Sequence, residues 1–229
     1  MFSTDQARAW LEATGAVIEA NAAALTKLDQ AIGDGDHGVN MARGFKAVGD
    51  KLPSLADADF AALFKGVSVA LIGKVGGASG PLYGSFYLGL SKALADVGAA
   101  GEIDDDTFAA GLRAGLDAVV ARGKAQLEDK TMVDALTPAM DALEAALGEG
   151  RGLGDALDAA LGEGRELGDA LDAAAAAADE GKKATIPLIA RKGRASYLGE
   201  RSRDHQDPGA TSSHLIVKAL ADVVNGRET

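Results

Sequence analysis

Alanine and leucine recur at helical spacing along most of this chain, whereas residues that favour strands are sparse and rarely alternate. Small and straight-chain residues favour helices, and strands depend on β-branched and aromatic residues. Aromatic residues make up only 4% of the sequence. The sequence therefore predicts an all-α fold. Its 229 residues, 47% of them hydrophobic, suffice for one well-packed core.

Eight helical segments are predicted from this periodicity and from the capping residues before each segment. The first begins after Ser3-Thr4-Asp5 and ends near Asp29–Ile32. Because no linker-like stretch divides the chain, residues 1–229 are predicted to form a single domain. The other seven segments are expected at about 39–48, 57–72, 81–97, 104–121, 132–147, 167–180 and 210–224.

A tandem duplication occupies residues 147–174. Its two 14-residue copies differ only at Gly152 and Glu166. Two copies are too few for a solenoid, which needs at least about three repeats. Since 14 residues is close to four turns at about 3.6 residues per turn, an added copy roughly preserves the face of a helix. We assign it no chemistry, and its glycines predict a weak, mobile helix.

Charge and composition exclude several classes of protein. A net charge of −11 makes nucleic acid or an anionic membrane a poor partner. The absence of cysteine excludes disulfides, thiolate catalysis and zinc–thiolate sites, and it fits a reducing cytoplasm. No signal peptide is visible, and no apolar run reaches the roughly 18 residues of a membrane span. A cytoplasmic protein without nucleic-acid or membrane partners is expected.

Three aspartates, Asp29, Asp34 and Asp36, gather where the first predicted helix ends in a Gly-Asp turn. Carboxylates so close together repel one another unless a cation neutralises them. Oxygen ligands favour Mg²⁺ or Ca²⁺ over zinc. An EF-hand does not fit, because Gly38 stands at a ligand position and no glutamate closes the loop. A surface turn with capping aspartates remains an equal alternative.

Two further loops could bind an anion. The glycines of Gly76–Pro81 would let backbone N–H groups approach it, and the helix that starts near Pro81 would point its positive end there. No Gly-Lys-Ser/Thr follows, so this is no Walker A loop. Arg191–Arg203 is a basic patch in an acidic chain. A tight turn and a solvated loop are the simpler explanations for each segment alone. No Gly-x-Ser-x-Gly motif indicates a serine nucleophile.

Taken together and in order, these motifs resemble the nucleotide-binding L subunits of dihydroxyacetone kinases, which carry a DAK2-type domain. The resemblance runs from the first helix to the last, and the duplication is its main departure. It rests on Leu28-Asp29, Gly33-Asp-Gly-Asp-His-Gly-Val-Asn-Met41, Gly77-Ala-Ser-Gly80, Asp129-Lys-Thr-Met132, Gly193–Arg201 and Asp207-Pro-Gly-Ala-Thr211.

The resemblance implies a barrel of eight antiparallel helices that binds ADP or ATP among the loops at one end. It implies two Mg²⁺ ions held by Asp29, Asp34 and Asp36, and a catalytic role for Arg191 or Arg194, between which the spacing does not decide. The residues it implies for nucleotide binding are His37, Gly38, Val39, Asn40, Gly77, Ala78, Ser79, Gly123, Thr131, Met132, Arg191, Arg194, Asp207, Pro208 and Gly209.

The implied activity is phosphorylation of dihydroxyacetone together with a separate K subunit that binds the sugar. Because the chain carries no K module, it resembles the branch in which ADP is a bound coenzyme. In that branch the M subunit of the phosphotransferase system rephosphorylates the ADP. An ATP-dependent kinase subunit for dihydroxyacetone or a related small ketose remains an alternative, and so does an ADP-binding regulatory co-activator. A homodimer is also left open.

Fatty acid kinase nucleotide domains are a structural rival with a related helical fold. They carry threonine where this chain has His37, and they have additional domains. The Asp-His-Gly sequence at this position therefore argues against them.

Overall fold

The structure is a computed structural model that describes residues 1–97, 101–149 and 166–228. Part of the duplicated segment, residues 150–165, lies outside the described residues. The described α-helices are α1 Thr4–Ala20, α2 Ala22–Ile32, α3 His37–Lys51, α4 Phe60–Lys74, α5 Ser79–Ala93, α6 Asp105–Gly123, α7 Val133–Glu149, α9 Glu166–Ala184 and α10 Pro208–Val224.

Capping residues start several of these helices where the sequence predicts. Asp59, Asp104 and Asp207 each accept a backbone N–H with their side chain and so begin α4, α6 and α10. Ser3 forms a capping box with Gln6 before α1. The caps at Ser3, Asp59 and Asp104 were predicted from the sequence because a cap is a local interaction, whereas Asp207 was predicted only as part of a turn.

Several helix boundaries differ from the prediction; α4, for example, begins at Phe60 and not near 57, and α10 begins at Pro208 and not near 210. The first predicted helix is broken at Asn21 into α1 and α2, so the described residues hold nine α-helices and not eight. The Asn21 side chain donates to the Val17 carbonyl (2.8 Å), an interaction that competes with helix continuation. The helix expected at Pro81 begins two residues earlier and ends at Ala93. Proline is tolerated there because first-turn N–H groups need no partner within the helix.

Short elements complete the fold. Two 3₁₀ segments, η1 (Leu52–Leu55) and η2 (Arg194–Ser202), follow α3 and α9. β1 (Phe2–Ser3) and β2 (Glu102–Ile103) pair antiparallel, a contact that an all-α prediction misses. Phe2 thereby inserts its ring at the end of the core, stacked on Phe108 with ring centroids 3.7 Å apart.

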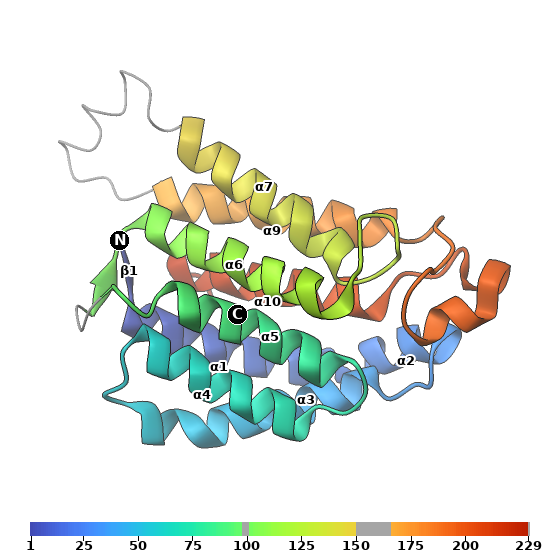
Figure 1. Ribbon diagram of the computed structural model, residues 1–229, viewed down its shortest axis with the longest axis horizontal. Helices are drawn as coiled ribbons and strands as arrows, with labels where there is room; N and C mark the ends of the chain where they lie inside the picture. The colour runs from blue at the N-terminus through green and yellow to red at the C-terminus, as the bar shows by residue number, and fades with distance from the viewer. Residues whose placement is uncertain (98–100, 150–165, 229) are drawn as a thin grey trace.

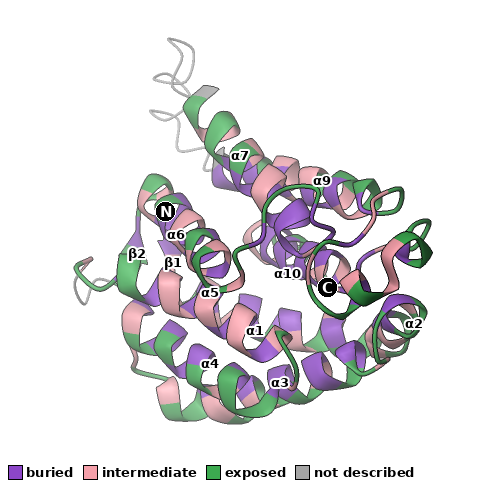
Figure 2. Ribbon diagram, turned by 45° about the vertical axis from the view of Figure 1, so that its right-hand side comes forward, coloured by how far each residue is buried: buried purple, intermediate pink, exposed green. Residues whose placement is uncertain are grey.

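The helices form a closed ring in which α1 contacts α3, and α3 to α7 contact one another in order. The ring closes as α7 contacts α9, α9 contacts α10, and α10 contacts α1 (Figures 1 and 2). This arrangement matches the expected barrel. The connections α2–α3, α4–α5, α6–α7 and α9–α10 lie at one end of it, and β1 lies at the other (Figure 1). No helix among the described residues is both long and apolar enough to cross a membrane.

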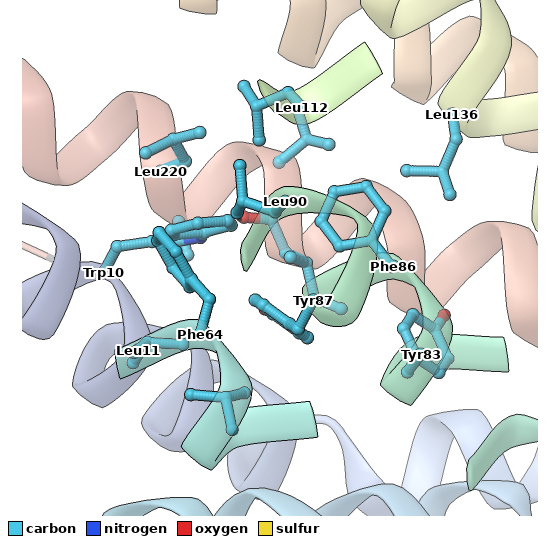
Figure 3. Packing of buried hydrophobic residues seen from close by; sticks show 14 of the residues in the cluster. Trp10, Leu11, Phe64, Tyr83, Phe86, Tyr87, Leu90, Leu112, Leu136 and Leu220 are labelled. Atoms are coloured by element: carbon cyan, nitrogen blue, oxygen red, sulfur yellow. Dashed lines mark hydrogen bonds between the residues drawn. The ribbon is translucent and has the colours of Figure 1, made fainter. Parts of the chain in front are cut away.

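The ring interior is one hydrophobic cluster to which the ring helices contribute. Trp10 lies within it, with ring centroids 6.1 Å from Phe64 and 5.8 Å from Tyr87 (Figure 3). Its indole N–H donates to the Ile216 carbonyl (3.0 Å), so this buried donor is satisfied. A second, small cluster of Ile32, Ala190 and Ala195 packs η2 against the end of α2. It brings the arginine segment over the aspartate loop.

Candidate nucleotide and metal site

The turn between α2 and α3 brings the three predicted aspartates together. One carboxylate oxygen from each of Asp29, Asp34 and Asp36 lies within 4.8 Å of the others. Asp29 is buried, whereas Asp34 and Asp36 are exposed. Such convergence concentrates negative charge, so it favours a cation among these oxygens.

Backbone contacts hold Asp29 in this position. Its Oδ2 accepts from the Asp36 N–H (2.9 Å) and the His37 N–H (3.1 Å). A Cβ at position 33 would collide with the Asp29 carboxylate, so Gly33 is required beside it. Gly35 has φ +75°, a conformation that favours glycine. The turn thus needs both glycines to gather the carboxylates.

A cavity of about 760 Å³ opens beside this turn, between the four loops at the same end of the ring. That volume lies within the range of small-molecule sites, roughly 300–1,000 Å³. The predicted residues that line it are Asp29, Asp34, Asp36, His37, Gly77, Ala78, Ser79, Gly123, Thr131, Met132, Arg191, Arg194, Asp207, Pro208 and Gly209.

Three predicted residues, Gly38, Val39 and Asn40, do not line the cavity. Gly38 packs so closely on α2 that a Cβ would collide with the Ala22 carbonyl. Val39 leaves 57% of its side chain exposed. Asn40 is buried, and its Oδ1 accepts from Arg43 (2.6 Å). Of the predicted segment His37–Asn40, the cavity therefore meets only His37.

The arginine segment covers the aspartate turn. Arg194 Nε lies 3.0 Å from Asp34 Oδ2, which offsets part of the negative charge there. Arg191 also lines the cavity, and its backbone N–H donates to the Asp129 carbonyl (3.0 Å). The structure distinguishes the two arginines, which their spacing in the sequence did not, because Arg194 is the one paired with the aspartate cluster.

His37 is buried between two hydroxyl groups. Nδ1 lies 3.1 Å from Ser79 Oγ, at the cavity, and Nε2 lies 2.8 Å from Ser212 Oγ, on α10. Burial lowers the pKa of the imidazole, against the opposing effect of Asp29 and Asp36. A neutral ring that joins the two serines therefore stands beside the carboxylates.

On the opposite wall a buried lysine fixes the chain before the arginine segment. Lys130 Nζ donates to the carbonyls of Thr185 (2.8 Å), Ile186 (3.2 Å) and Leu188 (3.0 Å). These bonds use all three ammonium donors. Burial lowers the pKa of Lys130, while Asp207 and other nearby carboxylates raise it.

Asp207 begins α10 and lines the same wall. Its Oδ2 accepts from the Ala210 N–H (2.7 Å), and its backbone N–H donates to Thr185 Oγ1 (3.0 Å). Burial raises the pKa of this carboxyl from 3.8 to about 7, although the bonds from backbone N–H groups act against the rise. The turn that ends in Gly209 is thereby anchored to Thr185, whose carbonyl also accepts from Lys130.

Sequence reasoning missed several residues of the site. Lys130 stands inside the quoted Asp129–Met132 motif, which could have identified it. Tyr83 and Arg122 line the cavity from helices, and no local sequence signal marks them. Ser212 reaches His37 across 175 positions of sequence, a distance over which no single-chain pattern is informative.

The assembled site offers three kinds of contact to a ligand. Carboxylate oxygens converge at one side, an arginine and a serine hydroxyl lie beside them, and apolar groups of Met132, Val133 and Leu82 line the remaining wall. Such a cavity suits a ligand with an anionic end, bound through a cation, and a flat apolar end.

Comparison with known proteins gives the family. The sequence profile of the DAK2 domain matches residues 31–222. The chain is 39% identical over 212 residues to the ADP-binding subunit DhaL of the PEP-dependent dihydroxyacetone kinase of Escherichia coli, with 93% of each chain covered. It is 38% identical over 224 residues to the ADP-binding subunit DhaL of the PTS-dependent dihydroxyacetone kinase of Lactococcus lactis, covering 98% of this chain and all of the relative.

A solved structure shares the fold. The dihydroxyacetone kinase of C. freundii, in complex with AMP-PNP and Mg²⁺, superposes with a TM-score of 0.65 and 25% identity. The match covers 93% of this chain and 33% of that longer chain.

Proposed function

This chain belongs to the DAK2 domain family, and we propose that it is the ADP-binding subunit of a dihydroxyacetone kinase that takes its phosphoryl group from phosphoenolpyruvate. Its partners are a K subunit that binds dihydroxyacetone and an M subunit of the phosphotransferase system. ADP stays bound as a coenzyme: the M subunit would phosphorylate it to ATP, and the γ-phosphoryl group would then pass to dihydroxyacetone and leave ADP behind. A cytoplasmic location, with which the cysteine-free sequence is compatible, is part of this proposal.

The observation that carries the proposal is the convergence of three carboxylate oxygens beside a cavity of nucleotide size. Their chemistry fits Mg²⁺, which prefers a few carboxylates and phosphate oxygens and tolerates no soft ligands. We propose that Asp29, Asp34 and Asp36 hold two Mg²⁺ ions. When bound, these ions would neutralise phosphate charge, on which phosphoryl transfer depends.

The remaining residues orient the nucleotide. Arg194 and the Ser79 hydroxyl lie beside the aspartates and would hold phosphate oxygens, aided by backbone N–H groups at the start of α5. Gly123, Thr131 and Met132 form the far wall and would face the adenine. Asp207, Pro208, Gly209 and Arg191 also line the cavity and would close over the nucleotide.

A reconstituted kinase assay tests the activity. The chain is mixed with K and M subunits, phosphoenolpyruvate and dihydroxyacetone, and formation of dihydroxyacetone phosphate is measured. Product is expected only when all subunits are present. No product with phosphoenolpyruvate or ATP as donor would contradict the enzymatic role and favour the ADP-binding co-activator.

Mass spectrometry of the natively purified protein tests whether ADP is retained. Co-purified ADP is the result expected for a coenzyme. A nucleotide-free protein that is active with ATP would instead favour the alternative, an ATP-dependent subunit for dihydroxyacetone or a related small ketose. The same spectrum would report whether the chain is a monomer or a homodimer.

A further inference from the structure

Tyr83 lines the cavity from α5 and forms hydrogen bonds with the first turns of α10. Its hydroxyl lies 2.7 Å from Ser212 Oγ, 2.9 Å from Ser213 Oγ and 3.1 Å from the Gly209 carbonyl. The side chain is 97% buried, since only 3% of it is exposed. Tyr83 belongs to α5, whereas all three partners belong to α10.

These bonds continue as a chain to the cavity. Ser212 Oγ lies 2.8 Å from His37 Nε2, and His37 Nδ1 lies 3.1 Å from Ser79 Oγ. Each hydroxyl owns one hydrogen, and a neutral imidazole also carries one. Carbonyl oxygens compete for these hydrogens, because Ser212 Oγ also lies 3.0 Å from the Pro208 carbonyl and 3.2 Å from the Gly209 carbonyl. When Ser212 donates to His37 instead of a carbonyl, the hydrogens along the chain all point toward the cavity.

The direction decides what Ser79 offers to a ligand. If Ser79 donates inward to His37 Nδ1, the cavity meets only its lone pairs, which repel an anion. If His37 Nδ1 donates to Ser79 Oγ, the serine hydrogen is free to point into the cavity. A diphosphate would select this second direction, because a hydrogen bond to a charged group is stronger than one between neutral groups.

We propose that Tyr83 is a positioning residue that, by donating to Ser212, directs the hydrogen of Ser79 toward the phosphate oxygens of the bound nucleotide. The proposal rests on the proposed function for the identity of the anion. Tyr83 donates to Ser212, Ser212 donates to His37 Nε2, and His37 Nδ1 donates to Ser79. Hydrogen bonds aligned in this way polarise and strengthen one another.

Tyr87 provides a matched control one turn further along α5. It is fully buried, like Tyr83, and both side chains are drawn in Figure 3. Its hydroxyl has no hydrogen-bond partner among the described residues. Tyr87→Phe therefore removes the same atom as Tyr83→Phe without touching the chain of bonds.

Nitrogen-15 NMR of the histidine rings in the ADP- and Mg²⁺-bound full-length protein tests the bond direction. The resonances of His37 are identified by their loss in His37→Gln. We expect the wild-type ring to carry its hydrogen on Nδ1 and not on Nε2. A ring protonated at Nε2 in this complex would overturn the proposal.

Binding measurements test the role of Tyr83 at the phosphate end. Tyr83→Phe and Ser212→Ala should each weaken Mg²⁺·ADP binding about three- to tenfold and leave adenosine binding unchanged. Tyr87→Phe should bind both ligands like the wild type. The double variant should bind ADP no more weakly than Ser212→Ala alone, because Tyr83 acts through Ser212.

The results of these experiments distinguish a failure of the positioning role of Tyr83 from a failure of the proposed ADP-binding function. Equal ADP affinity of Tyr83→Phe and Tyr87→Phe, or additive losses in the double variant, would overturn the positioning role alone. If the wild-type protein failed to bind ADP, the proposed function would fall and this inference with it. Thermal unfolding of each variant shows whether the fold is retained, and it does not depend on the ligand.

Discussion

The interior of the helical ring is packed mainly by apolar side chains, whereas its loop end holds buried polar side chains in directed hydrogen bonds. In the interior, Trp10, Phe64 and Tyr87 pack ring against ring, and the Tyr87 hydroxyl has no hydrogen-bond partner among the described residues. At the loop end, Lys130 and His37 are also buried, yet each has its polar atoms hydrogen-bonded to other segments of the chain.

The contrast separates stability from positioning. Apolar packing in the interior stabilises the fold whatever binds at the end, because the hydrophobic effect is non-directional. The directed bonds at the loop end instead fix where particular atoms stand, since a hydrogen bond depends on distance and angle. Variants in the two regions should therefore change different measurements.

The largest change in stability is expected in the interior. Phe64→Ala removes a fully buried ring and should lower the free energy of unfolding by about 3–5 kcal/mol. Denaturant unfolding checks this value. The folded protein should keep the wild-type affinity for ADP, so a large loss of affinity in the folded fraction would break the separation of the two regions.

At the loop end, Asp34→Asn should lower phosphoryl transfer at least about a hundredfold, because one carboxylate of the metal cluster is lost. Stability should change by no more than about 0.5 kcal/mol, since the side chain is partly exposed. Asp50→Asn, on the exposed far end of α3, is the matched control and should keep full activity. An active Asp34→Asn protein would contradict the assigned site.

Lys130→Met should lower the stability of the protein and also loosen the segment that leads to Arg191. The change leaves the carbonyls of Thr185, Ile186 and Leu188 without their donor, at a cost of about 1–3 kcal/mol in unfolding free energy. Hydrogen exchange should rise in the segment that leads to Arg191. Unchanged exchange there would show that the lysine does not hold the arginine segment.

Asp207 should make stability depend on pH in an unusual direction. Its folded pKa is raised from 3.8 to about 7, so between these values the folded protein binds more protons than the unfolded chain. Its contribution to stability therefore falls as pH rises, by at most about 1.4 kcal/mol per pH unit. Asp207→Asn keeps a capping oxygen and should flatten this part of the profile. An unchanged profile would locate the titration elsewhere.

The smallest effect is expected for Tyr87→Phe. Removing a buried hydroxyl that has no partner should leave the unfolding free energy unchanged or slightly raise it, within about 0.5 kcal/mol. Thermal unfolding checks this. A loss of unfolding free energy above about 1 kcal/mol would mean that the hydroxyl is hydrogen-bonded, for example to water. The interior would then also depend on directed polar bonds, against the contrast drawn between the two regions.

The sequence predicts the elements of this fold better than their junctions. The caps at Asp59 and Asp104 were predicted because a cap acts within one turn, whereas Asp207 was predicted as part of a turn and not as the cap of the last helix. The break at Asn21 was missed because alanine and leucine continue the helical pattern on both sides of it. The closed ring of helices was available only through the family resemblance, since long-range contacts leave no local signal.

The site divides in the same way. The aspartates and glycines of Gly33–Asp36 were predicted because several polar and flexible residues stand together in sequence. Tyr83 and Ser212 meet only in the folded chain, 129 positions apart, so the hydrogen-bonded support behind His37 could not be predicted. The pairing of Arg194 with Asp34 could likewise not be predicted, because it depends on the small apolar cluster that packs η2 against α2.

Diffraction from crystals grown with ADP and Mn²⁺, recorded for the anomalous signal of the metal, tests the central claim most directly. The account predicts a metal peak bonded to oxygens of Asp29, Asp34 and Asp36 and to the diphosphate in the cavity. Bound ADP with no metal peak at these carboxylates, or a peak held by other residues, would contradict it.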